Sequence, residues 1–479
     1  MHHSIFAAEN WLATGKLRSV DLYPNSDDDL AKHTEVRWMT HWPPLHSLLY
    51  AATMMSGLSA GASTKVLALL SVIVGGFGWV LLLRTLGAPA VYLFGVAFAY
   101  PWMSFIARIY LDYKNDHWAC AIAPWIYLAI IQIPPLAGRA SENVGKIIGA
   151  GFLAGIGVSM KYSMAPFLMS SILYFVWLDG LDRSRARIVR ILFFGVAVIS
   201  PSIALFALNW ALSDRPVSPL SLGAGIDIST LSYFSPLSYF VRFITNTLAY
   251  PAGLDLLMTQ LDIHFLSKFG VKLLPGTLFV TTTVLLVLWV ILVRRSILDE
   301  IQTRLLAFLL ILTITLWMFL VFMNINGRFG HDYVSDPRLY MPVGLGWLAL
   351  CGVFLFNATQ KDSVWGIAFA SILIPASFSF LFFFLRGVTG EAFAAMPRSQ
   401  TAWIEYDPQE DAKPRKLARQ DAEHASFLAN LVRHRGEGPD LLVAPEGRFL
   451  TELAVPCFYT FRAMRDDGHF YYSGRKLEV

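Results

Sequence analysis

Charged residues are scarce in this 479-residue sequence, and the scarcity excludes an ordinary soluble protein. Asp, Glu, Lys and Arg make up 15% of the chain, whereas a globular domain uses about 25% because it must cover itself with polar surface. Hydrophobic residues make up 55%, and the mean hydropathy is +0.52. This composition is typical of a protein whose surface faces lipid.

Cysteine is also rare, and the net charge is small. Cys120, Cys351 and Cys457 stand far apart with no C-x-x-C spacing, so the sequence indicates neither a thiolate cluster nor a disulfide framework. The net charge of +4 is too small for this length to indicate binding of nucleic acid. The first 30 residues have none of the apolar h-region of a signal peptide.

Long apolar runs are what the sequence has in abundance. Crossing a hydrocarbon core of ~30 Å takes about 20 residues, and eight stretches are long enough: 64–84, 87–107, 117–136, 188–210, 275–293, 304–324, 340–358 and 364–385. The stretch 147–179 is long enough for two more, but Lys161 interrupts it, and a lysine is costly in lipid unless it faces a cavity. We predict two short helices there, meeting near Met160, Lys161 and Tyr162.

The predicted fold class is an all-α polytopic membrane protein of about 10 transmembrane helices, with a small C-terminal extracytoplasmic α/β appendage. Residues 1–62 are interpreted as the first extracytoplasmic loop, ending in an interfacial helix. Residues 63–386 form the transmembrane helical bundle, in which 211–274 is a long extracytoplasmic loop. Residues 387–479 form the appendage, where DAEHASFLANLVRH reads as an amphipathic helix and DLLVAPE as a buried strand.

Orientation follows from the Lys and Arg residues of the short connections, which favour the cytoplasm. If residues 1–45 lie outside, alternate connections on the inside carry the basic residues Arg84, Arg139, Lys146, Arg183, Arg185, Arg187, Arg190, Arg294, Arg295, Arg304 and Lys361. We therefore expect the N-terminal segment, the loop 211–274 and the appendage outside. The expected location is a bacterial inner membrane, with an extracytoplasmic site.

Charged residues at the mouths of spans are candidates for function, and here they gather on the outer side. The candidates are Asp112, Lys114 and Asp116 with His117, then Lys161, then His331, Arg338 and Tyr340, and finally His41. A carboxylate can take a proton from an acceptor hydroxyl, and Lys or Arg can hold a departing phosphate. The pattern therefore suits transfer chemistry on a phosphate-bearing lipid.

Structural readings of the same residues stay open. Asp112 and Asp116 could be solvated loop carboxylates, and Lys161 could extend along the apolar core to reach the interface. Arg338 and Tyr340 could form an interfacial anchor pair. The histidines have no H-x-x-x-H spacing, so they do not by themselves indicate a metal site; a divalent metal at Asp116 is left open.

Four segments, in order, resemble the polyprenyl-phosphate-sugar-dependent glycosyltransferases of the GT-C superfamily. The likeness is to the dolichyl-phosphate-mannose:protein mannosyltransferase-like branch, which includes aminoarabinose transferases. The segments are FAAENWLATG with HWPPLHSLLYA, NDHWACAIAPWIYLA, GFLAGIGVSMKYSMAPF and DPRLYMPVGLGWLAL. They resemble the family's first outer loop with its P-P-L element, its second acidic position, its G-L-x-x-G-L-A-x-L-T-K-Y element and its R-Y-x-x-P element.

The resemblance implies transfer of one sugar from a polyprenyl-phosphate donor to an unknown acceptor at the extracytoplasmic face. It assigns Asp116 to the acceptor or a metal, Lys161 and Arg338 to the donor phosphate, and Tyr340 to the pocket wall. His41-Trp42 stands where aminoarabinose transferases tend to carry Glu-Lys, which argues against their donor specificity. A transporter and a catalytically inactive relative remain alternatives.

The family's principal acidic residue follows a first span, and this sequence opens inside the loop that would come next. We therefore expect Met1 to be an internal methionine of a longer protein with 11 transmembrane helices. The missing segment would supply an Asp or Glu just ahead of His2, and the 479-residue form would be inactive without it.

Overall fold

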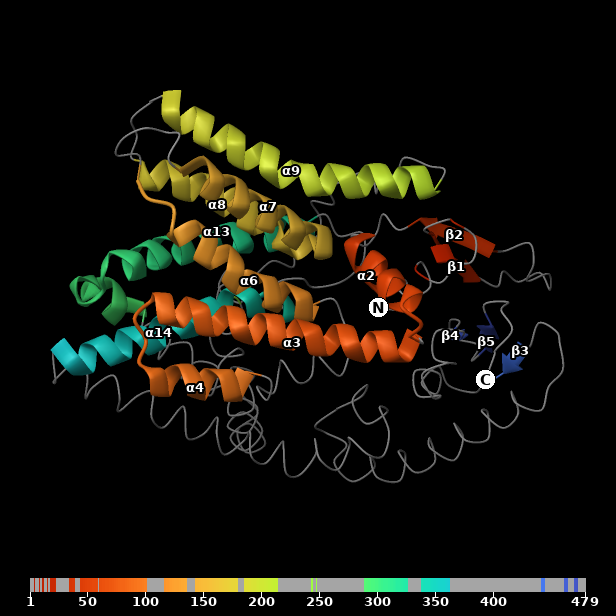
Figure 1. Ribbon diagram of the computed structural model, residues 1–479, viewed down its shortest axis with the longest axis horizontal. Coiled ribbons are helices and arrows are strands. Elements are labelled where there is room, and N and C mark those ends of the chain that lie inside the picture. Colours follow the sequence, from red (N-terminus) through yellow and green to blue (C-terminus); the bar gives the residue numbers. More distant parts are fainter. Residues whose placement is uncertain are drawn as a thin grey trace, which may run out of the picture.

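The computed structural model describes residues 44–58, 60–100, 116–135, 143–179, 185–213, 288–325 and 337–361, with short strands and single residues outside these ranges. This part of the chain is predominantly helical (Figure 1). Its helices are α2 (Pro44–Met55), α3 (Ala60–Thr85), α4 (Ala90–Ala99), α6 (Asp116–Ile131), α7 (Val144–Met160), α8 (Ala165–Leu178), α9 (Arg185–Ser213), α13 (Glu300–Ile325) and α14 (Met341–Lys361). The short 3-10 helices η4 (Tyr162–Met164), η8 (Arg295–Ile297) and η10 (Pro337–Leu339) precede α8, α13 and α14.

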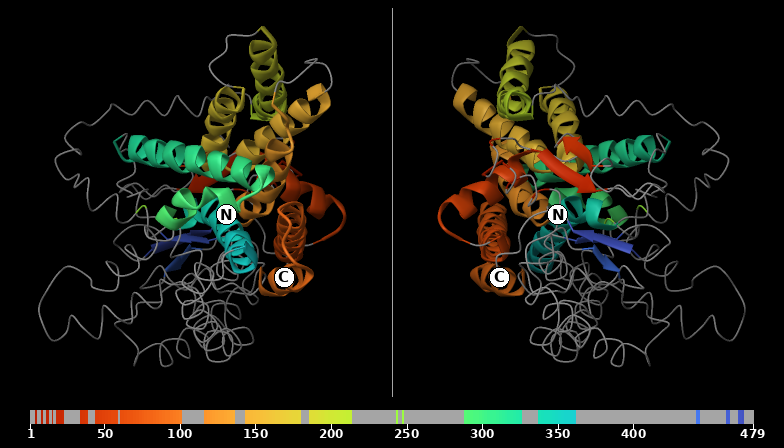
Figure 2. Two further views of the ribbon diagram at one scale, coloured as in Figure 1. Left: turned by 90° about the vertical axis from the view of Figure 1, so that its left-hand side faces the viewer. Right: turned by 90° about the vertical axis from the view of Figure 1, so that its right-hand side faces the viewer.

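Four helices are long and apolar enough to cross a membrane by length and composition. They are Ala62–Thr85, Arg187–Leu205, Glu300–Met323 and Met341–Ala358, which confirms long apolar helices at the predicted spans 64–84, 188–210, 304–324 and 340–358. The helix α9 lies at the edge of the bundle (Figure 2). It exposes large apolar side chains, among them Ile188, Leu192, Val196 and Ile203. Such a surface is typical of contact with lipid, so the molecule associates with a membrane.

Two predicted helix boundaries are wrong, each for a local reason. The span predicted to reach residue 136 ends at Ile131, because Pro134 and Pro135 lack the backbone N–H that would continue the helix. Its 16 residues rise about 24 Å, less than a full hydrocarbon core. The connection predicted to hold the arginine cluster is helical from Arg185 onward, since α9 begins there and buries Arg187 and Arg190. Arg183 lies outside the described residues.

The remaining predicted elements are described in part. The span 87–107 contains α4, whose helix runs over ten residues to Ala99; residues 101–115 lie outside the described part, as do 364–385 and most of 275–293 and 211–274. The predicted break at Lys161 is confirmed, with α7 on one side and η4 and α8 on the other. A helix is present at α2, where an interfacial one was predicted.

Five short strands lie outside the helical part. In the N-terminal segment, β1 (Arg18–Leu22) pairs antiparallel with β2 (Thr34–Trp38), a hairpin that the sequence analysis did not predict. Near the C-terminus, β3 (Leu441–Val443), β5 (His469–Tyr472) and β4 (Phe461–Ala463) pair in that order. The strand β3 falls in the predicted DLLVAPE strand, whereas the predicted helix at 421–434 lies outside the described residues.

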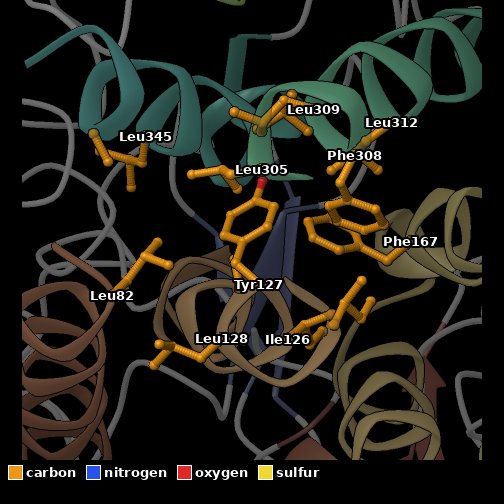
Figure 3. Close-up of a cluster of buried hydrophobic side chains, with 14 of the residues drawn as sticks. Leu82, Ile126, Tyr127, Leu128, Phe167, Leu305, Phe308, Leu309, Leu312 and Leu345 are labelled. Atoms are coloured by element: carbon orange, nitrogen blue, oxygen red, sulfur yellow. The ribbon is translucent and has the colours of Figure 1, made fainter. Parts of the chain in front are cut away.

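The helix α6 forms the centre of the bundle because it is apolar on all sides. It contacts α3, α7, α13 and α14, and nearly every one of its residues is buried. Tyr127 of α6 lies among Leu305, Phe308 and Phe167 (Figure 3), and its hydroxyl donates a hydrogen bond to the carbonyl of Pro342 at 2.9 Å. Because the core surrounds α6, a polar residue at the end of this helix is buried among the other helices.

The two ends of the bundle differ in charge, and one of them is basic. Here Arg190 pairs with Asp179, with Nη1 at 2.9 Å from one carboxylate oxygen, and Nη2 donates to the Pro134 carbonyl at 2.9 Å. Arg304 donates to the carbonyls of Ile131 and Ile133, and Gln302 donates to that of Leu86. Arg84, in the last turn of α3, lies at the same end (Figure 1). The described basic residues assigned to the inside therefore share one end.

Candidate functional site

Asp116 begins the central helix at the end opposite the basic one. It is the first residue of α6, where a negative side chain is favoured by the helix macrodipole. The residue is 3% exposed, because the helix that carries it is surrounded by others. The structure therefore excludes the reading of Asp116 as a solvated loop carboxylate.

Lys161 occupies the break between α7 and η4. Its backbone is extended, with φ −155° and ψ 126°, so the helix ends there. The Lys161 N–H donates to the Gly157 carbonyl at 2.9 Å, and its own carbonyl accepts from the N–H of Met164 at 3.0 Å. These hydrogen bonds hold the break in place, and Lys161 is 7% exposed.

The position of α7, and with it that of Lys161, depends on two glycines that pack against α9. A Cβ at Gly151 would lie 2.6 Å from the carbonyl oxygen of Phe194, and one at Gly155 would lie 2.3 Å from that of Val198. Both distances are far below normal contact, so larger residues would force the helices apart. Small residues four apart allow such close approach between helices in lipid.

Asp116 and Lys161 form a buried ion pair, in which Nζ contacts Oδ1. The two residues are 45 positions apart in sequence, and the contact between α6 and α7 brings them together. Each charge alone would be costly to bury, and the attraction between the two offsets part of that cost. Their positions in the sequence indicate separate roles for the two residues and do not predict that they touch.

Two buried histidines lie beside the ion pair. His117 follows Asp116 on α6, and its ring lies 6.0 Å from that of His46 on α2, centroid to centroid. The Nδ1 atom of His46 is 3.2 Å from the hydroxyl of Ser4, and its ring also meets Tyr50 edge-on at 5.0 Å. His46 is 1% exposed, so α2 and the N-terminal segment close this end of the site.

Burial lowers the pKa of His46, and the electrostatic influence of His117 and Lys161 lowers it further. His46 is therefore neutral near pH 7, because even an unperturbed histidine has a pKa of about 6.5. A neutral ring has one donor and one acceptor nitrogen. Among the described residues, the Nε2 atom of His46 has no hydrogen-bond partner.

The other predicted site residues divide into two groups. Tyr340 is fully buried at the start of α14, where its ring packs edge-on against Phe243 at 5.6 Å, and Arg338 in η10 is partly exposed. The helix α14, which begins directly after them at Met341, has its first turn at the end of the bundle where α6 begins (Figure 1). The remaining candidates lie outside the described residues: His41, Asp112, Lys114 and His331.

His46 is the site residue that sequence reasoning missed. It lies two residues after Pro44 in HWPPLHSLLYA, on the buried face of α2 with Ser47, Tyr50 and Ala51. The spacing of 46, 47, 50 and 51 is that of one helix face, which was a usable signal. What it could not show was that this face meets His117.

The sequence left open whether a divalent metal binds at Asp116. Among the described residues, no three His, Cys, Asp or Glu side chains lie close enough together to hold one ion. The chain matches no known family model, no curated protein and no solved structure. Fold and site together define a helical, membrane-associated protein with a charge pair buried at one end of its bundle.

Proposed function

We propose that this protein is a membrane glycosyltransferase that transfers a sugar from a polyprenyl-phosphate donor to an acceptor. The observation that carries the proposal is the Asp116–Lys161 ion pair, buried at the end of the bundle opposite the basic residues. These are the two residues that the sequence resemblance assigns to acceptor and donor phosphate. Their contact supports one shared site rather than two solvated charges.

The pair can serve both partners of such a reaction. The donor's phosphate would attract the Lys161 ammonium, which would release the Asp116 carboxylate to accept the proton of the acceptor hydroxyl. The acceptor oxygen then bonds to the anomeric carbon, and the bond from that carbon to the phosphate oxygen breaks. The polyprenyl phosphate leaves with the electron pair, and Lys161 stabilises its added negative charge. Arg338 would assist at the phosphate, and Tyr340 would line the pocket.

The proposed location is the extracytoplasmic side of a bacterial inner membrane. Lys and Arg near the ends of spans favour the cytoplasm, and the described basic connections lie together at one end. The Asp116–Lys161 pair would then face outward, where a lipid-linked sugar would meet its acceptor.

Transfer from labelled donors tests the proposal directly. The protein is expressed with any in-frame codons upstream of Met1, and release of sugar is measured from a panel of radiolabelled undecaprenyl-phosphate hexoses and pentoses. We expect Asp116→Asn and Lys161→Ala each to lower the rate at least ~100-fold, as for loss of an acid–base or phosphate-stabilising group. Lys65→Ala is the matched control because Lys65 is exposed on α3. Absence of turnover with every donor in the wild type would overturn the assignment.

A proton-coupled transporter is the second candidate, and one observation favours it. Lys161 lies at a break between two short helices, and transporters often place coupling residues at broken helices. Proteoliposomes containing the protein would then acidify or accumulate solute under a proton gradient, with no release of sugar from any donor. Lys161→Ala would abolish that uptake rather than transfer.

A further inference from the structure

Arg187, at the basic end of the bundle, is a buried cation, and two of its nitrogen atoms have no acceptor among the described residues. Its side chain is 9% exposed, and neither Nε nor Nη2 has a hydrogen-bond partner among the described residues. Burial of such a charge is stable when an anion accompanies it.

The neighbouring Arg190 adds to this positive charge. It lies one helical turn further along α9, so both arginines are on the same face of the helix. Asp179 accepts from Nη1 of Arg190 at 2.9 and 3.1 Å, and the Nε atom of Arg190 has no partner within the described residues. Asp179 thus pairs with Arg190, and no ion pair of Arg187 is found within the described residues.

The N-terminal end of α9 also favours binding of an anion. This helix of 29 residues begins at Arg185, and the first four backbone N–H groups of a helix have no partner within it. They carry the positive end of the macrodipole and favour anions. The Cα–Cβ bond of a helical residue tilts toward the N-terminus, which directs Arg187 toward these N–H groups.

We propose that the N-terminal turn of α9 binds a phosphate-bearing anion, with Arg187 as its principal ligand. The planar fork of a guanidinium matches two oxygens of a phosphate, and backbone N–H groups at a helix start commonly bind the same group. The phosphate belongs either to a phospholipid headgroup or to a soluble phosphate. The site lies at the end of the bundle opposite Asp116 and Lys161, so it does not depend on the proposed transfer reaction.

Ligand-dependent stabilisation tests the site. The purified protein in uncharged detergent is titrated with dioctanoyl-phosphatidylglycerol, with inorganic phosphate and with dioctanoylglycerol, which lacks phosphate, and the rise in Tm is measured. We expect saturable stabilisation by a phosphate-bearing ligand and none by dioctanoylglycerol. Arg187→Gln should weaken the apparent affinity at least tenfold, as for loss of charge-assisted hydrogen bonds. Lys146→Gln is the control, because Lys146 is exposed in the first turn of α7.

Each outcome of the titration decides the proposal. Stabilisation by the lipid alone supports a headgroup site, and stabilisation by inorganic phosphate supports a soluble ligand. The proposal is overturned if neither stabilises the wild type, or if Arg187→Gln binds as tightly as Lys146→Gln. If Arg187→Gln does not fold, Arg187→Lys keeps the charge without the planar fork, and unchanged affinity in that variant would reject the guanidinium fork as the phosphate ligand.

Discussion

The buried pair of Asp116 and Lys161 makes a quantitative prediction about stability. Both residues are nearly inaccessible, at 3% and 7% exposure, so solvent screens their interaction little. Two opposite charges at about 4 Å interact by about 4 kcal/mol at an effective dielectric constant of 20. Removal of one partner from such a pair typically costs about 3–5 kcal/mol, because the other charge stays buried alone.

A double-mutant cycle measures the interaction free energy between Asp116 and Lys161 separately from their contacts with other residues. We expect Asp116→Asn and Lys161→Met each to lower the free energy of unfolding by about 3 kcal/mol or more. The double variant should lose far less, because a buried ion pair can be replaced by neutral groups at little cost. The sum of the single effects should therefore exceed the double effect by at least about 3 kcal/mol. Equilibrium unfolding in mixed micelles, followed by tryptophan fluorescence, measures all four proteins.

The ion pair between Glu300 and Arg304 is a matched control within the same protein. The Glu300 side chain is 77% exposed and that of Arg304 is 13% exposed, so solvent reaches one partner of this pair, which has a spacing of four residues in α13. Such pairs contribute about 0.3–0.5 kcal/mol. If the Asp116–Lys161 cycle gives a coupling no larger than the Glu300–Arg304 cycle, the two buried residues do not pair, and the site argument fails with them.

Three further predictions follow from other parts of the molecule. Gly155→Ala should destabilise the protein by about 1–3 kcal/mol, because its Cβ would lie 2.3 Å from an α9 carbonyl oxygen. Gly149→Ala is the control and should not destabilise the protein, because the space around its Cβ is open. The free energies of unfolding of the two variants are compared, and equal stability would contradict the close packing of α7 on α9. His46 has a lowered pKa in the folded state, so the unfolded chain binds more protons below about pH 6.5 and stability should fall as the pH drops through that range. His46→Gln should flatten this dependence in thermal unfolding between pH 5 and 7, and an unchanged slope would reject the assignment. In intact cells, an impermeant thiol reagent should label Ser56→Cys and miss Lys146→Cys in a background without the native cysteines, and the reverse pattern would invert the proposed orientation.

Much of the fold could be predicted from local pattern alone. Continuous apolar runs are sufficient to place α3, α9, α13 and α14, because a helix that faces lipid needs no partner to define its composition. The break at Lys161 was also predictable, since a lysine within an apolar run disfavours an uninterrupted span. The ends of the helices were harder to predict from the sequence. Pro134 and Pro135 end α6, while the start of α9 at Arg185 depends on burial of its arginines.

The residues of the candidate site could be predicted in part from the sequence, but the contacts between them could not. The sequence identified Asp116 and Lys161 separately, from their positions at the ends of apolar runs. It assigned no role to His46, because a histidine on an apolar helix face has no local pattern that distinguishes a site from a core. Arg187 was interpreted as a loop cation, and its burial emerged from the packing of α9 against the bundle.

The sequence by itself determined that the chain forms apolar helices, where several of them lie, and which end of the bundle carries the basic residues. These properties depend on composition and spacing along the chain, which are local. Only the tertiary structure decided that Asp116 touches Lys161, that His46 meets His117, and that two nitrogen atoms of Arg187 are left without an acceptor in the described residues. Each of these depends on side chains that are brought together, or kept apart, by packing between helices. Packing is set by shape: Gly151 and Gly155 permit a close approach to α7, but their spacing in the sequence does not show that α9 is the helix that packs there.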